Sequence, residues 1–175
     1  MSDSGTDARP IIVAYDGTPQ AKAALRETAH LFGSGTRPVI VLTVWEPGLM
    51  NVAIAPAPGG IGAAVPPPDP DVVREVDRSE EDHARAIAQD GVALAGSLGL
   101  AAEALAVRDE ANVADTIVHV AEERDAQAVV VGSRGLSHLR SVLIGSTSDG
   151  VLHRIRRPLL IVHADEDAGA EQSAR

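Results

Sequence analysis

The chain has 175 residues, which fits one ordinary domain, and its 45% hydrophobic and 23% charged residues are typical of a soluble globular protein. Fifteen basic and 25 acidic residues give a formal charge of −10, which disfavours nucleic acid and anionic membranes as partners. The chain has no cysteine, which excludes disulfides, thiolate metal sites and a cysteine nucleophile, and it has only three aromatic residues, so we expect an aliphatic core.

The first predicted unit is a strand followed by a helix. Residues 1–10 are polar and lack the apolar stretch of a signal peptide, so we expect a cytoplasmic protein. Residues 11–15 form a short apolar run with β-branched side chains, which is typical of a strand buried on both faces. Thr18 and Pro19 suit the start of a helix, and Gly33 suits its end.

A long loop follows the second predicted strand, which covers residues 39–44. Eleven of the 24 residues in 47–70 are Gly or Pro, a composition that excludes a membrane helix and indicates a flexible loop. Because the loop leaves the carboxyl end of a strand, it is either a mobile surface segment or a flap over a binding crevice.

The remaining chain continues to alternate helices and strands. The pattern predicts helices over 71–98, 112–123 and 146–155, and strands over 100–107, 128–131 and 159–162. Alternating units of this kind form a parallel sheet with helices on both faces. We therefore predict an α/β fold in a single domain over 9–164, with an acidic tail over 165–175.

Candidate binding residues follow the first and fourth strands, since ligands of open α/β sheets bind where the strand order reverses. The first strand ends in Asp16-Gly17 and the fourth in Gly132-Ser133-Arg134-Gly135. Gly145-Ser146-Thr147 follows and opens a helix, whose free amides favour an anion. Ser146 and Asp149 also have the spacing of a capping box, which is an ordinary structural role.

The spacing Gly132-x2-Gly135-x9-Gly145-Ser146 after a buried strand resembles the nucleotide motif of the universal stress protein family. Asp16 in an Asp-Gly-Thr context and the ending Pro158-Leu-Leu-Ile-Val162 also resemble that family. The resemblance covers residues 9–164. It implies an open five-stranded parallel sheet of order 3-2-1-4-5, which is Rossmann-like and similar to the adenine nucleotide alpha hydrolases, and an ATP-binding member of the family.

The same resemblance implies roles for individual residues. Asp16 would face the ribose or a Mg²⁺ ion held by the nucleotide, and Val44 would bond adenine through its backbone. The ribose and phosphates would be held by Gly132, Gly135, Gly145, Ser146 and Thr147. The sequence departs from the family pattern at Gln127, where an acidic residue often stands, and at 111–113, where Gly-x-Pro is frequent. The second departure alters the loop beside the nucleotide.

Local charge supports a phosphate site. Five arginines and only one acidic residue lie between positions 134 and 157. Arg134 and Arg140 lie inside the glycine spacing and are the phosphate candidates, whereas the three arginines at 154, 156 and 157 fit the carboxyl end of a helix.

Other chemistries lack their motifs. The chain has no Gly-Lys-Ser/Thr, which excludes a P-loop, and no Gly-x-Ser-x-Gly elbow. Its six histidines show no paired spacing for a structural metal.

Three functions stay open. The first is a stress-response sensor or regulator that binds ATP, AMP or cyclic AMP. The second is a slow ATP-hydrolysing or phosphoryl-transfer enzyme built on Asp16 and a bound Mg²⁺, and the third is an interaction module with a vestigial pocket. We also expect a homodimer through the apolar strand 159–162, because open strand edges tend to pair and family members commonly dimerise in this way.

Overall fold

The computed structural model describes residues 9–33, 37–47, 69–109, 111–133 and 146–163. Its elements are β1 (Ile11–Ala14), α1 (Pro19–Phe32), β2 (Pro38–Trp45), α3 (Pro70–Ser97), β3 (Ala101–Arg108), α4 (Val113–Glu123), β4 (Ala128–Ser133), α5 (Ser146–Arg154) and β5 (Leu159–His163). Every strand and helix that the sequence predicts is present, with ends that differ by about two residues at most.

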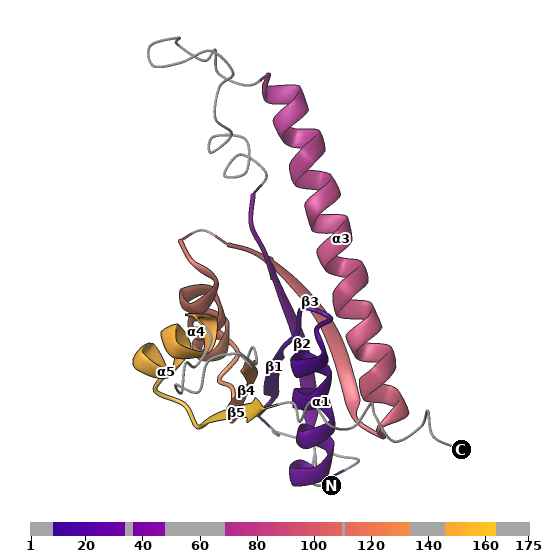
Figure 1. Cartoon of the computed structure of the whole chain (residues 1–175), viewed down its shortest axis with the longest axis vertical. Helices are drawn as coiled ribbons and strands as arrows, with labels where there is room; N and C mark the ends of the chain where they lie inside the picture. The colour runs from indigo at the N-terminus through magenta and orange to yellow at the C-terminus, as the bar shows by residue number, and fades with distance from the viewer. Residues whose placement is uncertain (1–8, 34–36, 48–68, 110, 134–145, 164–175) are drawn as a thin grey trace, which may run out of the picture.

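The five strands form one parallel sheet of order β3-β2-β1-β4-β5, which confirms the predicted fold class (Figure 1). β1 lies in the middle, where Ile11 is paired with Val39 of β2 on one side and with Ala128 of β4 on the other. After β1 the chain adds β2 and β3 on one side of it and then β4 and β5 on the other side. The strand order therefore reverses beside the carboxyl end of β1.

Helices cover both faces of the sheet, and the core is aliphatic as predicted. α1 and α3 bury one face, where Leu25 packs with Val41 and Tyr15. α4 and α5 bury the other face, where Ile117 and Val151 join a cluster that includes Leu42. Successive strand residues point to opposite faces, so β2 supplies both halves of the core and its side chains are buried on both sides.

α3 packs against the sheet through small residues. Its fully buried positions are Ala84, Ala88, Gly91 and Ala95. A Cβ atom added at Gly91 would lie 2.6 Å from Cγ1 of Val41 and 2.9 Å from Cδ1 of Tyr15. The small side chains allow the helix backbone to lie close to the sheet, and larger residues such as Ile87 and Leu94 pack at the edges of this contact.

The start of α3 overlaps the predicted loop. Asp69 caps the helix by accepting a hydrogen bond from the Asp71 N–H at 2.9 Å, and Pro70 is the first helical residue. The end of the expected 47–70 loop therefore belongs to α3. The rest of that loop, residues 48–68, and the predicted tail 165–175 lie outside the described residues. Among the helices that are described, none has the length and apolar character needed to cross a membrane.

Candidate functional site

A cavity of about 260 Å³ opens at the carboxyl ends of β1, β2 and β4. Its walls come from strand ends, from the β1–α1 turn and from the first turns of two helices. The lining residues are Ala14, Tyr15, Asp16, Thr18, Ala21, Leu42, Val44, Glu46, Val113, Ile117, Val131, Gly132, Ser146, Thr147 and Ser148. The cavity lies where the strand order reverses, which is the position expected for a ligand site in this fold.

The cavity brings together predicted residues that are distant in the sequence. Asp16, Val44, Gly132, Ser146 and Thr147 all line it. The other predicted binding residues, Arg134, Gly135 and Gly145, lie outside the described residues, and so does Arg140.

The turn between β1 and α1 fixes Asp16 at the cavity wall. Its Oδ1 atom accepts hydrogen bonds from the Thr18 N–H at 3.1 Å and from the Thr18 hydroxyl at 2.6 Å. Thr18 in turn caps α1 by accepting from the Ala21 N–H at 3.2 Å. Gly17 has a φ of +77°, a left-handed conformation that glycine adopts without strain. The Asp-Gly-Thr sequence therefore shapes the turn as well as the cavity.

Gly132 lines the cavity, but packing also explains why a glycine stands there. A Cβ atom at this position would lie 2.7 Å from the backbone carbon and oxygen of Gln20 in α1. Gly132 therefore has a packing role, since the missing Cβ allows α1 to lie close to β4.

The first turn of α5 forms the wall beside β4. Ser146, Thr147 and Ser148 line the cavity there, and the buried Ser148 hydroxyl donates to the Gly132 carbonyl at 3.1 Å. The backbone N–H groups of a first helical turn lack partners within the helix and carry partial positive charge. This end of the cavity is therefore suited to an anionic group.

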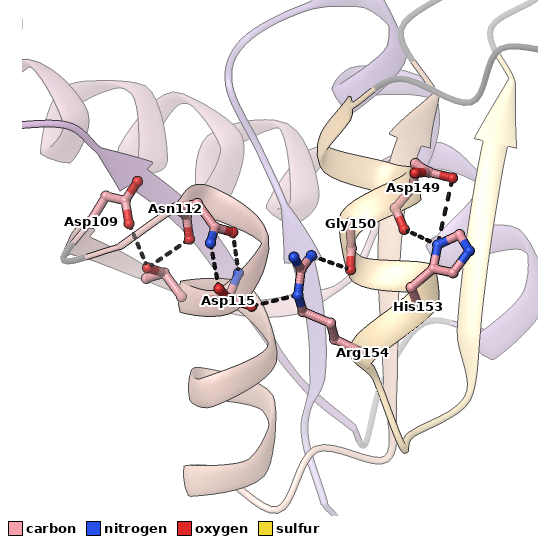
Figure 2. A network of polar contacts seen from close by, with 8 residues as sticks. Asp109, Asn112, Asp115, Asp149, Gly150, His153 and Arg154 are labelled. Carbon is pink, nitrogen blue, oxygen red and sulfur yellow. Dashed lines mark hydrogen bonds and ion pairs between the residues drawn. The ribbon is translucent and has the colours of Figure 1, made fainter.

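A polar network fixes α4 relative to α5 (Figure 2). Asn112 caps α4 by accepting from the Asp115 N–H at 3.0 Å. The Nε atom of Arg154 lies 2.9 Å from Oδ1 of Asp115, and its Nη1 donates to the Gly150 carbonyl at 3.0 Å. Arg154 thus binds a backbone carbonyl near the carboxyl end of α5, which is the structural role that the sequence suggested. α4 supplies Val113 and Ile117 to the cavity and α5 supplies Ser146, Thr147 and Ser148, so the network joins two helices that both line it.

The end of β3 joins the same network. The buried Asp109 accepts hydrogen bonds from the Thr116 hydroxyl and from the Ala111 N–H, both at 3.0 Å, and its own N–H donates to the Trp45 carbonyl at 2.7 Å. These bonds connect β2, β3 and α4.

Arg157, another arginine that the sequence analysis assigned to a helix end, has a structural partner as well. Its Nη2 atom lies 2.8 Å from Oδ1 of Asp125.

Some lining residues were not identified from the sequence. Glu46 stands two residues after Val44, and alternation along an extended chain was the signal that could have placed both on one side of the sheet. Tyr15 is buried, as expected, and burial raises the pKa of its hydroxyl, with the nearby Asp90 and Asp16 carboxylates adding to the rise. Within the described part of the chain, no cluster of histidine, aspartate and glutamate side chains is placed to hold a metal ion by itself.

The family model and the similar proteins of known family all point to the same family. Residues 8–163 match the model of the universal stress protein family. A universal stress protein of Mycolicibacterium smegmatis is 30% identical over 161 residues, which are 90% of this chain and 49% of the relative. One from Thermus aquaticus is 29% identical over 155 residues, covering 88% of this chain and 98% of the relative. The chain spans about half the length of several curated relatives that it matches.

Solved structures share the fold. A Methanocaldococcus jannaschii protein superposes with a TM-score of 0.68 at 18% identity, over 90% of this chain and 96% of that one. An Arabidopsis thaliana family member with AMP bound gives 0.59 at 16% identity, over 93% and 96%. An Archaeoglobus fulgidus member in complex with dAMP gives 0.50 at 24% identity, over 87% and 96%.

Proposed function

The chain belongs to the universal stress protein family, and from this premise we propose that it binds an adenine nucleotide, ATP with Mg²⁺, in the cavity at the carboxyl ends of β1, β2 and β4. The observation that carries the proposal is that one cavity combines an apolar slot with the start of a helix. Relatives of the same fold hold AMP and dAMP, which supports an adenine nucleotide.

The two ends of the cavity differ in chemistry. One end has aliphatic walls from β2 and α4, namely Leu42, Val44, Val113 and Ile117, which suit the flat apolar faces of a purine. The other end has the first turn of α5, which suits phosphates. The proposal also gives phosphate contacts to Arg134, Gly135 and Gly145, as the sequence motif implies.

The proposed Mg²⁺ fits the donors at this site. Magnesium in nucleotide sites is held by one or two carboxylates together with the phosphates of the substrate. Asp16 supplies a carboxylate at the cavity wall, and Thr18, Ser146 and Thr147 supply hydroxyl groups nearby. When bound, Mg²⁺ would neutralise part of the phosphate charge, while Asp16 would orient it.

We assign the protein a role as a sensor or regulator in which nucleotide occupancy is the signal. AMP and cyclic AMP are the alternatives to ATP within the same proposal, and a cytoplasmic location is also part of it. Binding is the property to test first, because every version of the role depends on it.

Two valines offer a matched test. Val44 and Val107 are register partners on β2 and β3, but only Val44 lines the cavity. Val44→Phe fills the apolar slot and is expected to weaken ATP binding by at least about tenfold, which corresponds to an overpacking cost of roughly 1–3 kcal/mol. Val107→Phe is expected to leave the affinity unchanged. Calorimetry with Mg²⁺-ATP measures the affinity of both folded variants and of the unaltered protein. A Val44→Phe protein that binds ATP as tightly as the unaltered protein does would overturn the assigned site.

A further inference from the structure

A second cavity, of about 480 Å³, opens between α1 and α3, the two helices that cover the same face of the sheet (Figure 1). Tyr15 lines both this cavity and the proposed nucleotide cavity. The β1–α1 turn is shared as well, because Asp16 and Thr18 line the nucleotide cavity whereas Gly17 lines the second one. We call the second cavity the α1–α3 groove. Besides Tyr15 and Gly17, it is lined by Lys22 and Arg26 of α1 and by Ile87, Asp90 and Leu94 of α3.

Tyr15 brings to the groove a hydroxyl that the fold leaves without a partner. The residue is only 4% exposed, yet its hydroxyl forms no hydrogen bond with any other described residue. No fully enclosed side-chain oxygen or nitrogen in the described part of the chain lacks a partner, so this hydroxyl must reach open space. The ring lies against α3, since a Cβ atom added at Gly91 would lie 3.0 Å from its Cε1. The hydroxyl is therefore available to a ligand in the groove as a hydrogen-bond donor.

The charged groups around this hydroxyl agree with its placement. Burial raises the pKa of Tyr15, Asp90 and then Asp16 raise it further, and Arg26 lowers it. Asp90 and Arg26 both line the α1–α3 groove. The hydroxyl therefore lies near charges that belong to both walls of the groove.

The two walls of the groove carry opposite charges that do not pair with each other. Lys22 and Arg26 are one helical turn apart on α1, so they share a face of that helix. Asp90 stands on α3. Among the residues that the structure describes, none of these three side chains forms an ion pair or a hydrogen bond. The groove thus has two unpaired cations on one wall and one unpaired carboxylate on the other.

The α3 wall is apolar on either side of Asp90. Ile87, Asp90 and Leu94 are three and four residues apart, so they lie on one face of the helix. Ile87 and Leu94 pack against the core, which fixes their positions. A cavity with apolar walls and a few polar groups is typical of a site for a small molecule.

A small ligand that contacts both walls needs an anionic group for α1, a cationic group for α3 and an apolar part between them. We propose that the α1–α3 groove binds a free α-amino acid with an apolar side chain. Its carboxylate accepts hydrogen bonds from Lys22, Arg26 and the Tyr15 hydroxyl. Its ammonium group donates to Asp90, and its side chain packs on the apolar face of α3. The inference does not depend on the proposed function, because it concerns a different cavity.

The test uses L-leucine and 4-methylpentanoate, which is the same molecule without the amino group. Amide NMR titrations of the full chain measure both affinities. L-leucine is expected to cause saturable shifts at Gly17 and Leu94, and 4-methylpentanoate is expected to bind at least about tenfold more weakly. Arg26→Gln is expected to weaken both ligands by about tenfold. Asp90→Asn is expected to weaken L-leucine by about tenfold and to leave 4-methylpentanoate no weaker.

Arg37→Gln is the matched control. Arg37 is exposed and directly precedes β2, so it lies at the opposite end of the parallel sheet from the groove. Its replacement removes the same charge and is expected to leave both affinities unchanged. Circular dichroism establishes that each variant is folded.

Three results would overturn the inference. The first is an absence of saturable shifts at Gly17 and Leu94, or shifts confined to Val44 and Ser146 in the nucleotide cavity. The second is an equal effect of Arg26→Gln and the Arg37 control, which would show a response to net charge alone. The third is equal affinity for the two ligands, which would show that Asp90 binds no ammonium group. None of these results bears on ATP binding, so the proposed function is tested separately.

Discussion

Asp16 holds a turn and also lines the proposed nucleotide site. Its Oδ1 atom holds the β1–α1 turn through two bonds to Thr18, and the same residue lines the cavity. The turn alone explains an aspartate before Gly17, since such residues commonly bond the backbone two positions on. A test of the metal role must therefore preserve the turn.

Asp16→Asn removes the charge and keeps an oxygen that can accept from Thr18, whereas Asp16→Ala removes both. If Asp16 orients Mg²⁺, both variants are expected to weaken Mg²⁺-ATP binding by about tenfold or more. Only Asp16→Ala is expected to lose stability, by about 1 kcal/mol for the lost turn bonds. Calorimetry and urea unfolding measure the two effects. Tighter ATP binding by Asp16→Asn would show that the carboxylate merely repels phosphate.

Tyr15 provides a titration that reports on its burial. Burial raises its pKa above 10.0, and the Asp90 and Asp16 carboxylates add to the rise while Arg26 opposes it. Tyr15 is the only tyrosine in the chain, so the ultraviolet absorbance of tyrosinate follows the ionisation of this one group.

We expect the titration midpoint of the folded protein to lie above 10.0. The folded state then holds the proton more tightly than the unfolded state does. The resulting stability is present below the unfolded pKa of about 10 and is lost as the pH rises through the folded pKa. Tyr15→Phe should remove this part of the alkaline loss of stability. A midpoint at or below 10.0 in protein that circular dichroism shows to be folded would contradict the assignment.

Single residues also show where sequence reasoning reaches its limit. Asp16 could be selected because it follows a predicted strand, and Ser146 because it begins a predicted helix. The packing role of Gly132 could not, because it depends on the backbone of Gln20 lying within 2.7 Å of a missing Cβ atom. Glu46 was missed because a charged residue just after a strand is ordinary unless the cavity beside it is known.

Among the elements, α4 and α5 depend on each other through Arg154 and Asp115. Both side chains are about half exposed, at 48% and 42%, so solvent weakens their ion pair. In a double-mutant cycle of Arg154→Met and Asp115→Asn, we expect a coupling energy of about 0.5 kcal/mol in the free energy of unfolding. Urea unfolding of the four proteins measures it. Strictly additive effects would show that the pair does not hold the two helices together.

α3 shows what helical periodicity can and cannot predict. Apolar spacing and the closing Gly99 place its limits within about two residues of those observed. The depth of packing was not predictable, because it depends on Tyr15 and Val41, which lie far away in the sequence and meet Gly91 only in the folded chain. Small residues within an apolar stripe thus became the closest contacts.

β5 lies at an edge of the sheet, where a second copy of the chain could pair with it. It is an edge strand whose residues Leu159–Val162 are only partly buried, and within the described chain it is paired with β4 alone. We predict a homodimer in which two copies of this edge pair, since an apolar open edge is prone to pairing. Ile161→Pro should remove a donor and yield monomer or aggregate. Sedimentation at micromolar concentration tests this, and a monomeric unaltered protein would show that the edge does not pair.

Much of the architecture was predictable, but from two different sources. Alternating strands and helices predicted a parallel sheet covered on both faces. The strand order 3-2-1-4-5 came instead from the family resemblance, because local patterns do not specify which strands become neighbours. The sheet order is what brings Val44 and Ser146 to one cavity, so the candidate site could be inferred only with both sources together.

The proposed function requires an adenine nucleotide to bind in the cavity between β2, β4 and the start of α5. The most direct measurement is an amide NMR titration of the unaltered protein with Mg²⁺-ATP. We expect saturable shifts of the amide signals of Val44, Gly132 and Ser146–Ser148. The signals of His119 and Glu123, which line a separate groove beside α4, should not shift. An absence of shifts at millimolar ATP, or shifts confined to that groove, would contradict it.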